Sequence, residues 1–227
     1  MLRFLIGVLI GSQVALGACR QVAADVPAPR LVRVAILVHD GVELMDFAGP
    51  AEVFTAAWGQ HREGDRVRFE VFTVSPTNEP VASSGIMHVK ATYSFENCPA
   101  PDVLVVSGGM TMPLLSNETV IEWIRKVGGE AEIAASVCTG AMLLAEAGLL
   151  DDKRATTHHN AIKLMRDRYP KVDVVEGQRF VDSGNLVTSA GVSSGIDMAL
   201  ALVERIGGAE LAARTATYLE YEREAGK

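Results

Sequence analysis

Apolar runs of strand length alternate with stretches of helical periodicity along most of this 227-residue chain. Because that alternation is typical of βαβ units, it predicts an α/β fold with a mostly parallel sheet. The run at 31–38 is almost wholly apolar, which predicts an interior strand covered on both faces. Further strands are expected at 67–74, 102–107, 130–137, 155–157, 172–175, 179–182 and 186–189, with an extended excursion or hairpin at 81–95.

The helical stretches lie between these runs, so the expected architecture is a three-layer sandwich. Helices are expected at 47–58, 118–127, 141–147, 160–169, 193–206 and 209–222. Pro50 would fall in the first turn of the first helix, where the missing N–H is tolerated. No internal repeat or linker divides the region 31–227, so we expect one domain there.

Residues 1–19 have the pattern of an export signal. Arg3 supplies the positive start, and the apolar run at 4–15 is too short and too interrupted for a comfortable membrane span. The sequence Leu16-Gly17-Ala18-Cys19 is similar to the lipobox of bacterial lipoproteins, whose cysteine is lipidated and becomes the mature N-terminus. We therefore expect a periplasmic protein, with a lipid on Cys19 as its only attachment to the membrane.

Residues 20–30 contain two prolines and would form a flexible tether to the domain. Two other interpretations of the N-terminus stay open. Cleavage after Ala24 would release a soluble periplasmic protein, and a misassigned start codon would leave a cytosolic one.

The charge and cysteine content exclude several classes of protein. A net charge of −7 without a Lys/Arg cluster argues against nucleic acid as a partner. Apart from Cys19 only Cys98 and Cys138 remain, too few for a disulfide scaffold, and they lie in different turns, so we expect no bridge between them. No paired Cys/His spacing indicates zinc, and we expect neither a metal nor a cofactor.

Cys138 ends an apolar strand-like run, and a strong helix-forming stretch follows at once. A cysteine at such a turn lies at the positive end of a helix, which favours thiolate over thiol. Gly140 and Ala141 leave room for a tight turn, as in the nucleophile turn of hydrolases. The alternative is an inert cysteine packed beneath the helix.

Three further segments are expected to join Cys138 at the carboxyl ends of parallel strands, where α/β sheets place ligands. They are the run 40–50, which holds Asp46, the turn Ser107-Gly108-Gly109-Met110 and the run Thr156-Thr157-His158-His159.

The ordered set D-F-x-G-P-x-E-V-F, S-G-G, S-V-C-T-G, G-L-L-(x)4-A-T-T-H and L-V-T-S-A-G-V-S-S-G-I-D resembles the ThiJ/PfpI superfamily. The resemblance covers about residues 31–222 and implies a flavodoxin-like, class I glutamine-amidotransferase-like fold. It is closest to the isonitrile hydratase-like branch and to the ligand-sensing domains of some AraC-type regulators. That branch often has Trp after Thr-Thr-His, where this chain has His159.

The resemblance implies roles for individual residues. Cys138 would be the nucleophile. Asp46 would stand beside the thiol, where repulsion between the two acidic groups would keep the carboxyl protonated so that it donates to the thiolate. It could then act as general acid or base. The alternative is that Asp46 caps the helix that follows. His158 would be a base paired with the cysteine, or else a helix cap or a histidine bonded to backbone.

Backbone N–H groups of Gly108, Gly109 and Thr139 could form an oxyanion hole. The alternative for the glycines is a tight turn without chemistry. The Thr139 hydroxyl could orient a substrate, and His159 is expected to line the pocket.

The favoured function is an enzyme that uses Cys138 on a small electrophile, with hydration of an isonitrile to an N-substituted formamide as the reaction that the resemblance implies. Glyoxalase-type hydration, amide hydrolysis, a periplasmic redox or stress protein and a non-catalytic ligand-sensing domain are the alternatives. A transcription factor is disfavoured by the export signal and by the chain's ending at Lys227. Relatives are commonly dimers, so a homodimer is expected.

Overall fold

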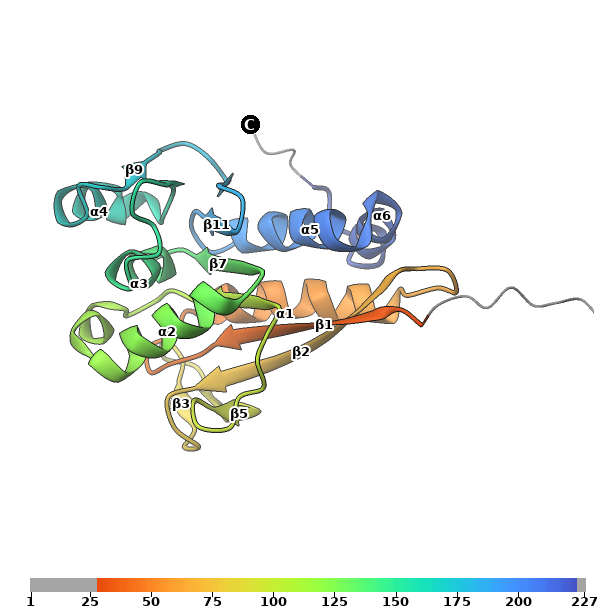
Figure 1. Ribbon diagram of the computed structural model, residues 1–227, viewed down its shortest axis with the longest axis horizontal. Coiled ribbons are helices and arrows are strands. Elements are labelled where there is room, and N and C mark those ends of the chain that lie inside the picture. The colour runs from red at the N-terminus through yellow and green to blue at the C-terminus, as the bar shows by residue number, and fades with distance from the viewer. Residues whose placement is uncertain (1–27, 224–227) are drawn as a thin grey trace, which may run out of the picture.

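The central sheet of the computed structural model, which describes residues 28–223, has seven strands in the order β10-β11-β7-β6-β1-β2-β5 (Figure 1). Neighbouring strands are parallel except for the antiparallel pair β10 and β11. The strands are β1 (Arg30–Leu37), β2 (Val67–Ser75), β5 (Tyr93–Ser94), β6 (Val103–Val106), β7 (Ile133–Val137), β10 (Phe180–Asp182) and β11 (Leu186–Ser189). The expected export signal, Cys19 and most of the tether lie outside the described residues.

Helices cover both faces of this sheet, which makes the predicted three layers (Figure 1). One face carries α1 (Leu44–Gly59), α5 (Ser194–Gly207) and α6 (Ala209–Tyr218). The other carries α2 (Glu118–Glu130), α3 (Gly140–Glu146) and α4 (Ile162–Arg168), with short 3-10 helices η1 (Met112–Ser116) and η2 (His159–Ala161). The prediction of a mostly parallel α/β sandwich is confirmed.

Two small ladders lie outside the main sheet. The predicted hairpin at 81–95 is confirmed by β3 (Val81–Ala82) and β4 (His88–Val89), which pair antiparallel before the chain joins the main sheet as β5. The strands expected at 155–157 and 172–175 are shorter, and they pair with each other as β8 (Arg154–Ala155) and β9 (Asp173–Val174).

β1 is an interior strand between β6 and β2, as its composition predicts. Val34 and Ile36 face the layer of α1, α5 and α6, while Ala35 and Leu37 face the layer of α2, α3 and α4. All four are fully buried. Since burial of a Val, Leu or Ile side chain contributes about 1.5–3 kcal/mol, this strand fixes the sheet on which the site is built.

α1 begins at Leu44, three residues before the predicted start, so Pro50 lies inside the helix and not in its first turn. Its N-cap residue, Glu43, makes no side-chain cap hydrogen bond and so gave no capping signal in the sequence. Because proline has no N–H, the carbonyl of Asp46 loses its helical partner. The Ser107 hydroxyl donates to that carbonyl instead, at 3.4 Å, which ties the start of α1 to the end of β6.

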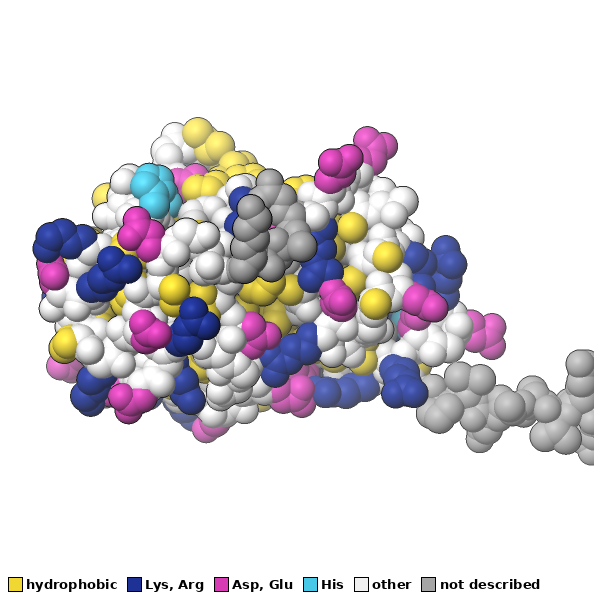
Figure 2. Space-filling view, turned by 90° about the horizontal axis from the view of Figure 1, so that it is seen from above, with side chains coloured by type: hydrophobic (Ala, Val, Ile, Leu, Met, Phe, Trp, Pro, Cys, Tyr) yellow, Lys and Arg dark blue, Asp and Glu magenta, His cyan; other side chains and the backbone are white. Residues whose placement is uncertain are grey.

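The surface seen from above has Lys/Arg and Asp/Glu side chains interspersed, without a broad field of one sign on that face (Figure 2). Within residues 28–223, none of the helices has the length and apolar character that crossing a bilayer demands.

Candidate functional site

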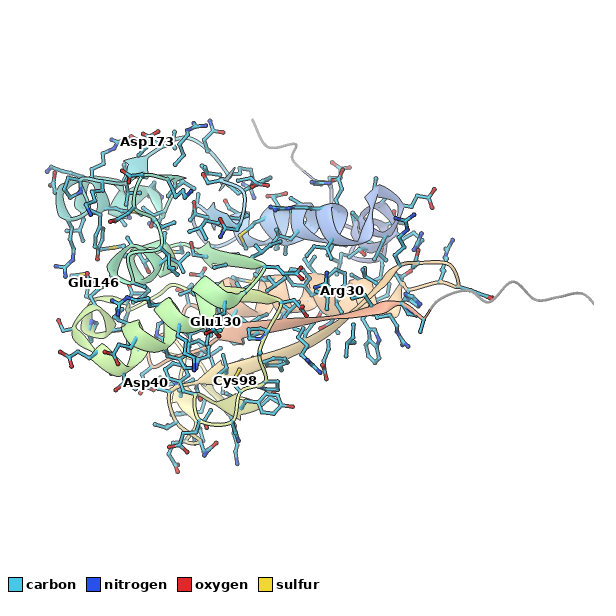
Figure 3. The ribbon with its side chains drawn as sticks, viewed as in Figure 1. Arg30, Asp40, Cys98, Glu130, Glu146 and Asp173 are labelled. Carbon is cyan, nitrogen blue, oxygen red and sulfur yellow. The ribbon has the colours of Figure 1, made fainter. Side chains whose placement is uncertain are left out.

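The four segments predicted to carry chemistry follow β1, β6, β7 and β8. β1, β6 and β7 are adjacent and parallel, so their carboxyl ends meet at one edge of the sheet. Figure 3 labels Arg30 at the amino end of β1 and Asp40 just past its carboxyl end, toward the left of the view.

Cys138 has a left-handed backbone conformation, with φ of 57°. Its N–H donates to the carbonyls of Ala190 at 2.9 Å and Ser189 at 3.2 Å, while its own carbonyl accepts from the Thr157 hydroxyl at 2.8 Å. A non-glycine residue in this region costs about 1–3 kcal/mol, so it persists only where the surroundings hold it. The turn therefore holds Cys138 in a strained conformation, as a nucleophile turn does.

Two glycines make this turn possible. A Cβ on Gly140 would overlap the carbonyl oxygen of Val106, so only glycine lets α3 start this close to β6. A Cβ on Gly108 would lie 2.7 Å from Oδ2 of Asp46, 2.7 Å from the Thr139 nitrogen and 2.9 Å from Cβ of Cys138. The glycine at position 108 thus lets the carboxyl and the cysteine come together.

Asp46 is fully buried and lies in the first turn of α1, so it is not the N-cap that the sequence left open. Its Oδ2 accepts from the Gly108 N–H at 3.1 Å. Its Oδ1 is buried and has no hydrogen-bond partner at good geometry among the described residues. Burial raises the pKa of Asp46 to about 7, the Gly108 N–H and the Cys138 thiol lower it, and the charge of Glu43 raises it further. The cause is chiefly desolvation, not the predicted repulsion by a thiolate.

Cys138 is also buried, with 7% of the residue exposed. Burial raises the pKa of its thiol to about 12, and the charge of Asp46 acts in the same direction. Backbone N–H groups of Thr139 and Val192 lower that pKa, but less than burial raises it. The expectation of a resting thiolate is therefore wrong: desolvation outweighs the helix N-terminus, and the proton resides on sulfur.

The amides proposed as an oxyanion hole are differently engaged. The Gly108 N–H is bound to Asp46, and the Gly109 N–H donates to the Thr139 hydroxyl at 3.0 Å. That hydroxyl in turn donates to the Gly109 carbonyl at 3.0 Å. Both glycine amides and the Thr139 hydroxyl are therefore occupied in this state. Of the three amides, the Thr139 N–H is the one directed at the Cys138 sulfur.

Val192 supplies the second amide at the sulfur, and no role had been assigned to it from the sequence. It also has positive φ, 38°, which is rare for a β-branched residue. The signal lay in the segment Gly191-Val192-Ser193-Ser194 between a strand and a helix. What could not be read from the sequence is the register that pairs Ser189 with Val137 and so sets this loop beside Cys138.

The two histidines take different positions. His158 is the N-cap of η2 and its Nδ1 accepts from the Asn160 N–H at 3.3 Å, which is the capping role left open above. None of the hydrogen bonds among the described residues joins it to Cys138. Burial and then the neighbouring His159 lower its pKa, so the ring is neutral at pH 7. The two rings lie 4.2 Å apart.

His159 lines a cavity of about 130 Å³ beside the cysteine turn, where a pocket wall was expected. The cavity also takes in Thr157 and Ala190, which bind the Cys138 backbone. Its remaining lining residues are Thr156, Ile162, Glu176, Gly177, Gln178 and Gly191.

Cys98 is a free, half-buried thiol on the β5 side of the sheet, bonded to the carbonyl of Pro99 (Figure 3). Cys138 is also free. Across residues 28–223, no cluster of three or more His, Cys, Asp or Glu side chains could hold a metal ion.

These features define an α/β-sandwich protein with a buried cysteine and carboxyl pair at the strand-to-helix turn. Residues 32–205 match the model of the DJ-1/PfpI family, and the chain belongs to that family. It is 34% identical over 192 residues to an isonitrile hydratase of Pseudomonas putida, covering 84% of this chain and 78% of the relative.

The family also includes regulators. The chain is 32% identical to the HTH-type transcriptional regulator CdhR of Pseudomonas aeruginosa over 78% of its own length, but it spans only about half of that relative, 51%. Among solved structures, a ThiJ/PfpI family protein from Pseudomonas syringae superimposes with a TM-score of 0.77 at 25% identity, covering 94% of this chain and 84% of that one. Drosophila melanogaster DJ-1beta superimposes with a TM-score of 0.69 at 22% identity, covering 84% and 98%.

Proposed function

We propose that this protein is a cysteine-dependent hydratase that converts a small isonitrile and water into an N-substituted formamide. The observation that carries the proposal is the buried pair of Cys138 and Asp46, in which the carboxyl interacts with the protonated thiol and keeps one oxygen, Oδ1, without another hydrogen-bond partner among the described residues. The isonitrile hydratase relative supports the choice of substrate.

The first step is addition of the thiol to the terminal carbon of the isonitrile. Asp46 accepts the Sγ proton while sulfur forms a bond to that carbon. The N–H groups of Thr139 and Val192 stabilise the negative charge on sulfur as the proton leaves. Asp46 then returns the proton to the same carbon, which gives a thioformimidate bound to Cys138 and restores the carboxylate.

The second step is hydrolysis of that intermediate. Water adds to the carbon, with one of its protons passing through Asp46 to the nitrogen. The remaining O–H proton leaves to Asp46 as the C=O bond forms and the C–S bond breaks, and Asp46 then reprotonates sulfur. The balance is one isonitrile and one water consumed for one formamide, and the nitrogen substituent would occupy the cavity lined by His159.

The test is turnover of cyclohexyl isocyanide by the purified protein in 18O-labelled water. We expect N-cyclohexylformamide carrying one labelled oxygen, at a rate well above that of buffer. Methylglyoxal is offered in parallel, and its conversion to lactate without isonitrile turnover would favour glyoxalase-type hydration. No product from either compound would contradict the proposed reaction.

A ligand-sensing domain is the second candidate, because the regulator CdhR aligns with most of this chain. It predicts that an isonitrile or another small molecule raises the melting temperature without being consumed. The redox role is less well supported, because oxidation requires an exposed, low-pKa thiol and Cys138 is neither.

For the N-terminus we propose export and lipid attachment at Cys19, on the lipobox-like Leu16-Gly17-Ala18-Cys19. An alkyne-bearing fatty acid fed to the expressing bacterium should label the wild type and not Cys19→Ser. Equal labelling of both proteins would contradict lipidation at this residue. An unlabelled product beginning at Asp25 would show cleavage after Ala24, and retention of Met1 would indicate a cytosolic protein.

A further inference from the structure

The loop 190–193, which brings the Val192 N–H to the sulfur, is tied to an ion pair outside the reacting groups. Asp197 lies in the first turn of α5 and is fully buried. The Arg179 guanidinium donates to its Oδ2 through Nε and a terminal nitrogen. Tyr221 follows α6 in the chain, and its hydroxyl lies 3.1 and 3.2 Å from the two carboxylate oxygens of Asp197. A buried carboxylate held by three donors fixes the start of α5 firmly.

The same arginine also holds the other end of the loop. The carbonyl of Arg179 accepts the Ala190 N–H at 2.8 Å, and the carbonyl of Ala190 accepts the Cys138 N–H at 2.9 Å. Arg179 is therefore joined to α5 through its side chain and to the cysteine turn through its backbone. Between these two attachments the chain passes through Val192, whose positive φ needs support from its surroundings.

We propose that the ion pair of Arg179 and Asp197 is a positioning element that holds the Val192 N–H against the Cys138 sulfur. Neither side chain is among the groups placed at the sulfur or lining the cavity. Loss of the pair should therefore weaken stabilisation of the attacking sulfur and leave substrate binding almost unchanged. The kinetic part of this inference depends on the proposed hydratase reaction, whereas the reactivity of the thiol does not.

A matched control exists at the other end of α5. Arg205 of α5 contacts Asp182 of β10 at 3.5 Å, so this pair also ties the β10–β11 hairpin to α5, but it is exposed and remote from the loop. Arg205 also donates to the carbonyl of Gly184, in the turn of the same hairpin, at 2.5 Å. Removing either arginine therefore removes one charge and side-chain links between α5 and this part of the chain. Only Arg179 is connected to Ala190.

The experiment compares the wild type with Arg179→Gln, Arg179→Lys and Arg205→Gln in two assays. For isonitrile turnover we expect Arg179→Gln to lower kcat about tenfold or more, with KM within about twofold. A displaced Val192 N–H would give only part of its stabilisation to the sulfur, so the effect is smaller than that of removing a donor altogether. For alkylation of Cys138 by iodoacetamide between pH 8 and 10, we expect a slower reaction at each pH. Arg179→Lys should recover part of both losses, and Arg205→Gln should match the wild type.

Wild-type kcat and alkylation rates in Arg179→Gln, or faster alkylation, would overturn the inference. Equal losses in Arg205→Gln would also overturn it, since they would indicate general loosening of α5. If the wild type does not turn over isonitriles, the hydratase proposal fails. The alkylation rates still test whether the Arg179–Asp197 ion pair positions the Val192 N–H. If Arg179→Gln does not fold, Tyr221→Phe replaces it. We expect this variant to be alkylated at Cys138 about twofold or more slowly than the wild type. Alkylation at the wild-type rate would contradict the inference.

Discussion

Replacing Cys138 by alanine is expected to lower isonitrile turnover by about 10⁴-fold or more, because losing the nucleophile removes the covalent route altogether. Cys138→Ser should be nearly as inactive, since a hydroxyl gives up its proton to Asp46 far less readily than a thiol. Initial rates of formamide formation measure both. The matched control is Cys98→Ala, which removes the other free thiol of the described chain, on the β5 side of the sheet, and should keep the wild-type rate. Activity in Cys138→Ala within tenfold of the wild type would exclude the thiol mechanism.

The same position allows a separate test of the strained turn. Cys138→Gly relieves the left-handed strain that both cysteine and alanine bear at φ of 57°. We expect the glycine variant to be about as inactive as the alanine variant but more stable than it, by about 1 kcal/mol in the free energy of unfolding. Urea denaturation of the two variants measures this difference. A glycine variant less stable than the alanine variant would show that the turn is not strained.

The architecture could be predicted because local patterns of apolar residues indicate most of its strands and helices. Leu186–Ser189 has the bounds predicted for it, and β1 is shifted from its predicted bounds by one residue at each end, since buried parallel strands are continuous apolar runs. The start of α1 cannot be predicted from a cap because Glu43 provides no capping side chain, and Asp46, the alternative cap, lies in the first turn of the helix. Turn residues and apolar periodicity are local signals, whereas an uncapped helix start depends on contacts such as that of Ser107 with Asp46.

The pairing of Cys138 with Asp46 could be predicted from the sequence, but the protonation of the pair and the amides around it could not. A helix N-terminus after Cys138 suggested a thiolate, yet the sign of the shift depends on burial, which the sequence does not state. The amide of Gly109 is bound by Thr139, and Val192, which supplies an amide to the Cys138 sulfur, lies 54 residues beyond Cys138 in sequence. Such pairings across the sheet follow from strand register and not from motif spacing.

Asp46→Asn is expected to lower kcat by about 10²–10⁴-fold, because an amide cannot accept the thiol proton. In the wild type Asp46 must be ionised to act as the base, so kcat/KM should rise with pH through about 7 and then level off, since the Cys138 pKa of about 12 lies beyond the measured range. Rates from pH 5 to 10 measure this rise, which should disappear in Asp46→Asn. A rate that falls as pH rises through 7 would show that the protonated carboxyl is the active form.

Glu43→Gln provides the matched control. The charge of Glu43 raises the pKa of Asp46, so the substitution should lower that pKa while leaving the Asp46 carboxyl in place. The rising limb should move to lower pH while the plateau rate stays near that of the wild type. An unchanged limb in Glu43→Gln, with a normal plateau, would indicate that the titrating group is not Asp46.

The same carboxyl should make the folded protein less stable as pH rises. A folded-state pKa of about 7 lies above the ordinary 3.8, so between these values the folded chain binds more protons than the unfolded one. The free energy of unfolding therefore falls from about pH 4 to pH 7, by a few kcal/mol, and stays low above pH 7. Asp46→Asn should lose this part of the pH dependence and be more stable than the wild type at pH 8 while being nearly inactive. Urea midpoints of the two proteins at pH 5 and pH 8 measure the pH dependence and the relative stability. If the variant is less stable than the wild type at pH 8, the Asp46 carboxylate stabilises the fold, and it is not a buried base that lowers stability for the sake of activity.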